Sequence, residues 1–268
     1  MKLSHKPKKS LGQNFLIDKN IIKKIVKIVE TSKNKNVMEI GGGYGNLTLE
    51  ISKLNLNILY VVEKDKNLSF ILRDKFEHNK NIKVINDDFL NINKKNISEK
   101  KITIVGNLPY NVSTKILSTL ILLEKWPPWY DKLVFMFQKE VADRIIATNK
   151  KKEFGRLAVL SNWRLEVTKH FDISNNCFLP KPKVDSTLLS FEPKEKNYLN
   201  LNNPKNLETI TRILFSSRRK MINKSFKKLF KNSTTIAQNL NLNLKLRPEE
   251  LDNETFYKIA QIYENLTN

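Results

Sequence analysis

Residues 36–54 read NVMEIGGGYGNLTLEISKL, and this stretch decides the fold class. Its first five residues, Asn36 to Ile40, are a largely apolar run that predicts a short buried strand. Glycines follow at positions 41, 42, 43 and 45, where the backbone can turn sharply and approach a ligand closely. Leu47 to Leu54 then repeats apolar residues at helical spacing. A strand, a glycine-rich turn and a helix in this order predict one unit of a parallel α/β sheet.

The rest of the first 193 residues continues this alternation of strands and helices. Further strands are expected at 58–62, 82–85, 102–105 and 132–137, with a terminal pair at 165–173 and 186–193. Helices are expected at 20–30, 47–54, 68–76 and 138–147. Pro193 to Asn206 is a polar linker, and only helical patterns follow it. We therefore predict an α/β domain at residues 1–193, with a mixed, mostly parallel sheet, and a small all-α domain at residues 194–268.

The composition excludes several classes of protein. The chain has 268 residues, of which 40% are hydrophobic, so it can form a packed core. No apolar run is long enough to span a bilayer, and the basic N-terminus MKLSHKPKKS is not followed by the apolar segment of a secretory signal. A single cysteine, Cys177, excludes an internal disulfide framework, and three scattered histidines offer no metal-ligand cluster. We expect a cytoplasmic protein without a metal or a membrane partner.

Basic residues are concentrated near the C-terminus. The formal net charge of +21 indicates a polyanionic partner, although 40 Lys and 33 Asn also fit an AT-rich genome. Residues 194–248 hold 13 Lys and Arg against two acidic residues. Within them, Ser216 to Lys231 reads SSRRKMINKSFKKLFK and predicts an amphipathic basic helix. This helix would bind nucleic acid through Arg218, Arg219, Lys220, Lys224 and Lys227; a solvated helix face and a membrane-surface or calmodulin-binding helix are the alternatives.

Acidic residues follow the next two predicted strands. Glu63 comes directly after the strand at 58–62, and Asp87 and Asp88 follow the strand at 82–85. Because ligands of open α/β sheets lie at the carboxyl ends of the strands, Glu63 can accept hydrogen bonds from ribose hydroxyls, and Asp87 or Asp88 from an adenine amino group. A helix cap or a turn would explain each acid singly. Together with the glycines they predict a nucleoside-containing cofactor, either S-adenosylmethionine (SAM) or a nicotinamide.

Ile104 to Ser113 reads IVGNLPYNVS and places an amide, a proline and an aromatic ring after the fourth strand. A plain turn, with Ser113 capping a helix at 116–123, is one explanation. The other is transfer of a methyl group to an exocyclic amino group. The Asn107 oxygen and a backbone carbonyl could hold the two amine hydrogens and aim the nitrogen lone pair, while Pro109 holds the turn and Tyr110 stacks on the base.

Several segments resemble one enzyme family. GNLPYN resembles the motif of amino-group methyltransferases in the form found in ribosomal RNA adenine dimethyltransferases. Four further regions agree with this family: KKSLGQNFLID (8–18), MEIGGGYGNLT (38–48), FQKEVADRI (137–145) and FLPKPKVDS (178–186), and FSSRRK (215–220) resembles its C-terminal domain. The resemblance covers nearly the whole chain and is greatest to the bacterial small-subunit enzymes, the kasugamycin-sensitivity dimethylases.

The resemblance implies a Rossmann-like, SAM-dependent methyltransferase domain and assigns roles to single residues. Asn14 and Leu16 would line the methionine end of SAM, Gly41 and Gly43 would form the turn, Glu63 would hold the ribose and Asp88 the adenine. Asn107 would contact SAM and orient the substrate amine, and Phe178 would close on the flipped adenine opposite Tyr110. Two positions depart from the family. Gly42 stands where it often has proline and should loosen the turn without removing a contact, and Asp87 stands where it often has glycine.

The expected activity is dimethylation of two adjacent adenines in the 3′-terminal hairpin of small-subunit ribosomal RNA, by a monomer that acts in small-subunit biogenesis. Three alternatives remain from the sequence. One is a large-subunit methylase of the erythromycin-resistance type, and the second is a non-catalytic RNA-binding assembly factor. The third, a nicotinamide-dependent oxidoreductase, lacks a hydride-handling His or Lys near the predicted cleft.

Overall fold

The computed structural model describes residues 8, 12–32, 34–92, 97, 100–196 and 199–267, and the chain forms two compact units. The first unit comprises residues 1–117, 128–142 and 168–193, and the second comprises residues 118–127, 143–167 and 194–268. The predicted domains and the observed units both divide the chain between residues 193 and 194, but the second unit also includes the earlier segments 118–127 and 143–167. The domain limits 1–193 and 194–268 stay a prediction.

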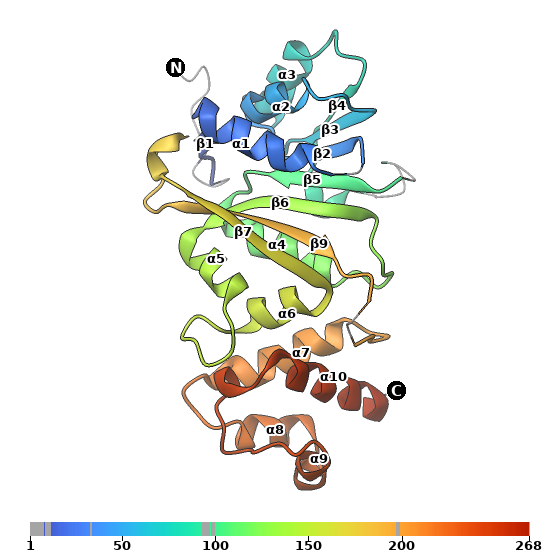
Figure 1. The fold of residues 1–268 in the computed structure, drawn as a ribbon. Helices are drawn as coiled ribbons and strands as arrows, with labels where there is room; N and C mark the ends of the chain where they lie inside the picture. Colours follow the sequence, from blue (N-terminus) through green and yellow to red (C-terminus); the bar gives the residue numbers. More distant parts are fainter. Residues whose placement is uncertain are drawn as a thin grey trace. The chain divides into compact units, whose positions relative to one another are not determined.

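A seven-stranded sheet runs through the first unit in the order β4-β3-β2-β5-β6-β9-β7 (Figure 1). Its strands are β2 (Asn36–Ile40), β3 (Ile58–Val62), β4 (Ile82–Ile85), β5 (Ile102–Gly106), β6 (Tyr130–Gln138), β7 (Leu165–Ile173) and β9 (Ser186–Pro193). The pairs β2–β3, β2–β5, β3–β4 and β5–β6 are parallel, and β6–β9 is antiparallel. The prediction of a mixed, mostly parallel sheet is confirmed.

Helices that pack their apolar side chains on this sheet are α1 (Lys19–Glu30), α2 (Asn46–Ile51) and α3 (Lys66–Lys75). The Asp18 side chain caps the N-terminus of α1 by accepting hydrogen bonds from the backbone N–H groups of Asn20 and Ile21. Ile25 of this helix belongs to the same core cluster as Val61 of β3. A separate antiparallel pair joins β1 (Phe15–Leu16) to β8 (Phe178–Leu179). Short 3₁₀ turns, η2 (Phe89–Asn91) and η4 (Asn175–Cys177), complete the unit.

The segment after β5 is helical from an earlier residue than the sequence indicates. Helix α4 spans Tyr110–Ile121, so Ser113 lies inside its first turn and does not cap it. The Ser113 hydroxyl donates to the Tyr110 carbonyl, a bond within the turn. The cap at Ser113, which belonged to the alternative of a plain turn, is therefore wrong, because the helix already begins after the Asn-Leu-Pro turn. Helix α5 (Lys139–Ile146) follows β6 as predicted.

The second unit is built from helices α6 (Arg156–Arg164), α7 (Lys205–Leu214), α8 (Asn223–Leu229), α9 (Ser233–Asn239) and α10 (Asn253–Thr267), with 3₁₀ turns η5 (Phe215–Ser217) and η6 (Pro248–Glu250). Its core contains an aromatic cluster in which the Phe215 and Phe256 rings stack with centroids 5.2 Å apart, and the Phe154 ring lies at 6.1 Å from that of Phe215. The expected helical C-terminal region is confirmed, whereas α6 had no counterpart among the predicted elements.

The prediction of one basic helix over Ser216 to Lys231 is wrong. The chain forms η5, has no continuous helix at residues 218–222 and becomes helical again in α8. Hydrogen bonds from elsewhere in the second unit stabilise this break. The Ile222 N–H donates to the Leu246 carbonyl at 2.9 Å, and the Arg218 guanidinium donates to the Lys152 and Phe154 carbonyls at 2.7 Å. Tertiary contacts thus override the helical pattern of the segment.

Two features are absent from the described ranges. Among these residues, none of the helices combines the length and apolarity needed to cross a membrane. The same part of the chain contains no group of three or more His, Cys, Asp or Glu side chains placed to hold a metal ion.

Candidate active site

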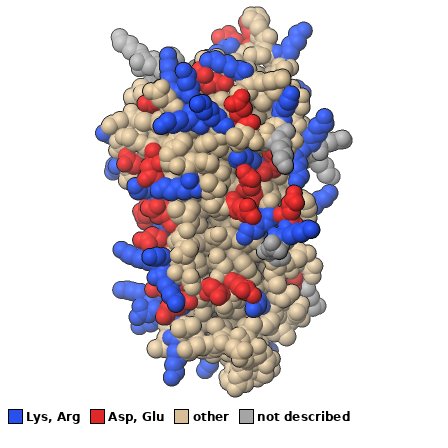
Figure 2. Space-filling view, in the orientation of Figure 1, with Lys and Arg blue, Asp and Glu red and all other residues tan. Residues whose placement is uncertain are grey.

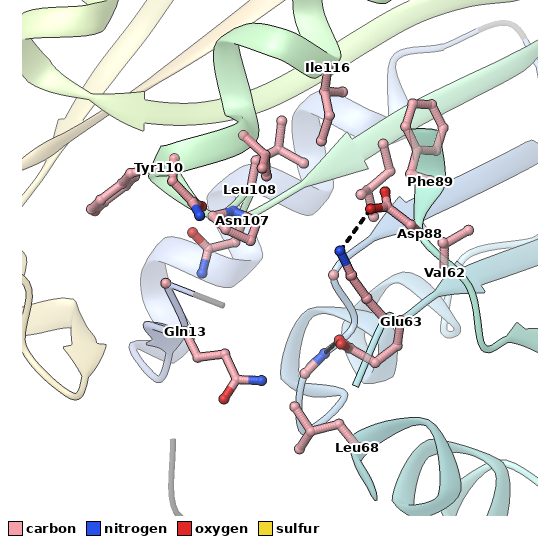
Figure 3. Close-up of a pocket in the computed structure, with 18 of the residues that line it drawn as sticks. Gln13, Val62, Glu63, Leu68, Asp88, Phe89, Asn107, Leu108, Tyr110 and Ile116 are labelled. Carbon is pink, nitrogen blue, oxygen red and sulfur yellow. Dashed lines mark hydrogen bonds and ion pairs between the residues drawn. The ribbon is translucent and has the colours of Figure 1, made fainter. Parts of the chain in front are cut away.

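A pocket opens at the carboxyl ends of β2, β3, β4 and β5, and all of its lining residues belong to the first unit. Its empty space, which includes the open mouth, is about 980 Å³. Eight residues predicted from the sequence line it: Asn14, Gly41, Gly43, Glu63, Asp88, Asn107, Pro109 and Tyr110. Figure 3 shows Glu63 and Asp88 toward one end of the pocket and Tyr110 at the other, with Asn107 between them.

The glycine-rich turn and Glu63 form one hydrogen-bonded unit. Gly43 has φ = 55°, and a Cβ atom there would lie 2.9 Å from Cδ1 of Phe15, so both the backbone and the packing require glycine. The Gly43 N–H donates to one carboxylate oxygen of Glu63 at 2.9 Å, and the Asp65 N–H donates to the other at 2.9 Å. Burial raises the pKa of Glu63, and the two N–H donors act against that rise.

Asp88 begins η2 and carries an ion pair that the sequence did not indicate. One carboxylate oxygen accepts from the Leu90 N–H at 3.0 Å, and the other lies 2.9 Å from the Lys64 ammonium. Burial opposes ionisation of Asp88, but the Leu90 N–H and the Lys64 charge outweigh burial and lower its pKa. Asp87 also lines the pocket, and its side chain accepts from the Asp88 N–H. Asp87 and Asp88 both line the pocket, so either could accept the predicted hydrogen bond from the adenine amino group of the cofactor.

The side-chain amide of Asn107 has a defined orientation. Its Nδ2 donates to the backbone carbonyl of Asn14 at 2.7 Å. Since a carbonyl oxygen can only accept, the nitrogen of the amide must face Asn14, and the oxygen Oδ1 is directed elsewhere as an acceptor. This contact joins the segment before β1 to the turn after β5, 93 residues apart in the sequence. The sequence analysis expects this oxygen of Asn107 to accept a hydrogen of the substrate amine.

Tyr110 is the first residue of α4, directly after Pro109 of the turn. Its ring lies at the end of the pocket, and its hydroxyl forms a hydrogen bond of 2.7 Å with the Ser186 hydroxyl. Burial raises the pKa of the Tyr110 phenol, the Ser186 contact acts against that rise, and the Asp185 charge adds to it. The phenol is therefore neutral at physiological pH.

Leu16 and Phe178 are brought together, but not in the pocket lining. They face each other as partners in the β1–β8 pair, at 5% and 2% exposure, and both belong to the apolar core. The roles assigned to them toward SAM and the adenine stay predictions. In the described conformation the Phe178 ring is covered by protein.

The basic residues predicted to bind RNA lie in the second unit. Arg219, Lys220, Lys224 and Lys227 are exposed. Arg218 is half-buried and is engaged with backbone carbonyls, with its guanidinium 3.6 Å from Glu249. Arg218 therefore has a structural contact in its own unit, which distinguishes it from the other four.

Several residues of the pocket were not predicted from the sequence, among them Gln13, Lys64, Leu68 and Phe89. Gln13 lies within KKSLGQNFLID (8–18), one of the segments that resemble the family, and this resemblance could have marked it as a pocket residue. No pattern in the sequence marks Lys64, because its role comes from the approach of Asp88, 24 residues away.

Comparisons with known proteins find relatives over nearly the whole chain. A family model described as ribosomal RNA adenine dimethylase matches residues 4–265. A protein from Pelagibacter ubique (strain HTCC1062), named ribosomal RNA small subunit methyltransferase A, is 51% identical over 261 residues, which are 97% of this chain and 98% of that protein. A protein of the same name from Wolbachia sp. subsp. Drosophila simulans (strain wRi) is 39% identical over 272 residues, 97% of this chain and 95% of the other.

Solved structures resemble the chain in fold. A dimethyladenosine transferase from Plasmodium falciparum aligns with a TM-score of 0.76 at 24% identity, over 94% of this chain and 98% of that one. The 23S ribosomal RNA methyltransferase ErmE aligns with a TM-score of 0.68 at 21% identity, over 94% and 100% of the two chains. At these identities the likeness concerns the fold, and it confirms the methyltransferase fold predicted from the sequence.

Proposed function

The chain belongs to the ribosomal RNA adenine dimethylase family, and from this membership we propose that it uses SAM to dimethylate two adjacent adenines of small-subunit ribosomal RNA. The two adenines would be those of the 3′-terminal hairpin, and the methyl groups go to their exocyclic amino groups. The observation that carries the proposal is the position of Asn107 in one pocket with Glu63 and Asp88. The amide that would orient the amine and the two acids that would hold the nucleoside of SAM thus line a single cavity.

The residues of the pocket fit SAM. Each carboxylate oxygen of Glu63 has one backbone donor and can accept a second hydrogen bond, which suits two ribose hydroxyls. Val62, Leu68 and Phe89 offer apolar surface for the adenine ring, and Asp88 an acceptor for its amino group. Asn14 and the turn at Gly41 would hold the methionine end. When bound, SAM supplies an electrophilic methyl group on its sulfonium sulfur.

At the substrate side, Asn107 would hold the target amine. An adenine amino group is a weak nucleophile because its lone pair is delocalised into the ring. The Asn107 oxygen and a backbone carbonyl of the Leu108-Pro109 turn would accept its two hydrogens, which directs the lone pair toward the methyl group. The target base must leave its stack to reach this position, and Tyr110 would stack on it there.

Affinity for RNA would come largely from basic side chains in the second unit. Arg219, Lys220, Lys224 and Lys227 are exposed and would contact phosphates. On the face that Figure 2 draws, Lys and Arg side chains are spread among Asp and Glu rather than gathered in one place. We expect Arg219→Ala to weaken RNA binding and to reduce its salt dependence by about one phosphate contact. A change in affinity without a change in salt slope would contradict this role.

The proposed setting is the cytoplasm, where the protein would act as a monomer on the assembling small ribosomal subunit. Small-subunit RNA as the substrate follows from the relatives' name, and the choice of one hairpin would follow from RNA shape.

The test is transfer of labelled methyl groups from SAM to small subunits that lack methylation at the hairpin, followed by mapping of the modified adenines. Wild type should dimethylate two adjacent adenines, and Asn107→Ala should lose the transfer while it still binds SAM. Asn67→Ala, an exposed asparagine of α3 outside the pocket, is the control. Transfer to large-subunit RNA alone would contradict the proposed substrate, and absence of SAM binding would favour a non-catalytic RNA-binding role.

A further inference from the structure

Tyr110 is tethered through its hydroxyl to the strand β9. The partner is the hydroxyl of Ser186, the first residue of β9, at 2.7 Å. Ser186 has no exposed surface, and its register partner on β6 is Gln138. The hydrogen bond therefore joins a pocket residue at the start of α4 to a buried, paired position of the seven-stranded sheet, 76 residues further along the chain.

The backbone around Ser186 is held by contacts to two other segments. The carbonyl of its neighbour Asp185 accepts from the N–H of Lys139 at the start of α5. The Asp185 carboxylate accepts from the N–H of Asn175 in η4 at 2.9 Å. Since three elements meet at this dipeptide, the Ser186 hydroxyl has little freedom to follow a moving ring.

A tyrosine that stacks on a base needs a defined ring plane. Rotation about the Cα–Cβ bond would move the phenol oxygen of Tyr110, so the contact with Ser186 restrains the position of the ring directly. Rotation about the Cβ–Cγ bond leaves that oxygen in place, and the contact restrains it more weakly, because the phenol O–H prefers to lie in the ring plane. A small misplacement of the ring would tilt the adenine and move its amino group away from the line of transfer, which lowers the rate steeply. The neutral phenol of Tyr110 and the Ser186 hydroxyl can each donate or accept this hydrogen bond.

We propose that Ser186 is a positioning residue that sets the ring of Tyr110 for stacking on the target adenine. This inference rests on the proposed function, because it concerns the same adenine site. Ser186 does not line the pocket and acts only through Tyr110.

The test compares single-turnover methyl transfer at saturating SAM and RNA with the dissociation constant of SAM. Ser186→Ala should slow the transfer about tenfold, the effect of one lost buried hydrogen bond, and should leave SAM affinity within about twofold. Ser186→Thr, which keeps the hydroxyl, should recover most of the rate. Ser190→Ala is the control, because Ser190 is also buried on β9 and bonds to His170 instead.

Tyr110→Phe removes the same hydrogen bond from the other side and keeps the ring. If Ser186 acts through Tyr110, the double variant should be no slower than Tyr110→Phe alone. Independent, multiplying effects of the two changes would overturn the inference, as would an unaltered rate in Ser186→Ala or an equal loss in Ser190→Ala. A wild-type protein that transfers no methyl groups to small subunits would overturn the proposed function and this inference together.

Discussion

Gly42 is the residue at which the structure changes an expectation most sharply. From the sequence, glycine at this position should only loosen the turn. A Cβ atom at Gly42 would instead lie 2.4 Å from Cγ1 of Val61 and 3.0 Å from Cδ1 of Leu72, both of which are fully buried. Gly42 is not among the residues with positive φ, so alanine is excluded by space and not by the backbone. We predict that Gly42→Ala destabilises the protein.

The size of the effect follows from two opposing contributions. Overpacking a well-filled core costs roughly 1–3 kcal/mol. Replacing glycine by alanine also reduces the freedom of the unfolded chain, which returns about 0.4–1 kcal/mol. Because Val61 belongs to the inner strand β3, which pairs with β2 and β4, it cannot shift freely, and the net loss in the free energy of unfolding should be roughly 1–2 kcal/mol.

Urea denaturation of single and double variants measures this loss. Val61→Ala removes the atom that the new Cβ would strike, so the double variant should be less destabilised than the sum of the singles, by roughly 0.5–3 kcal/mol. Gly155→Ala is the matched control, because a Cβ there would have its nearest neighbour at 3.9 Å. A neutral Gly42→Ala, or singles that add without coupling, would refute the steric explanation.

Three further outcomes are expected. Burial raises the pKa of Glu39 to about 8 from 4.5. The contribution of Glu39 to the free energy of unfolding is therefore full below about pH 4.5 and is lost as the pH rises through 8. Denaturation at both ends of this range should show that the stability of Glu39→Gln depends less on pH than that of the wild type. Lys64→Met should raise the pKa of Asp88, measured by NMR titration, and should change stability by less than about 1 kcal/mol because the ion pair is exposed. Arg164→Met should cost roughly 1–3 kcal/mol in thermal melts, since it removes the buried donor to the carbonyl of Leu123; an unchanged melting temperature would contradict this.

The strands could be predicted because of how they are buried. β2 and β3 have the predicted bounds, since strands covered on both faces of a parallel sheet are short apolar runs between polar residues. The edge strand β4 also has the predicted bounds, although none of its four residues is fully buried. Helix α6 was not predicted from the sequence, for a related reason. Its residues Ala158 to Ser161 are all buried, so no amphipathic period marks it as a helix. The basic segment at 216–231 shows the opposite error, a helical period that contacts with Leu246 and Phe154 interrupt.

At the site, the sequence by itself determined the parts that lie at strand ends. Glu63, Asp88 and Asn107 had to meet there, because parallel strands present their carboxyl ends at one edge of the sheet. Only the tertiary structure decided which atoms face each other. The Asn107 amide is oriented by Asn14, and the Tyr110 ring by Ser186, through hydrogen bonds between segments 93 and 76 residues apart. A local pattern reports the period of burial along the chain, whereas such contacts depend on how distant segments pack.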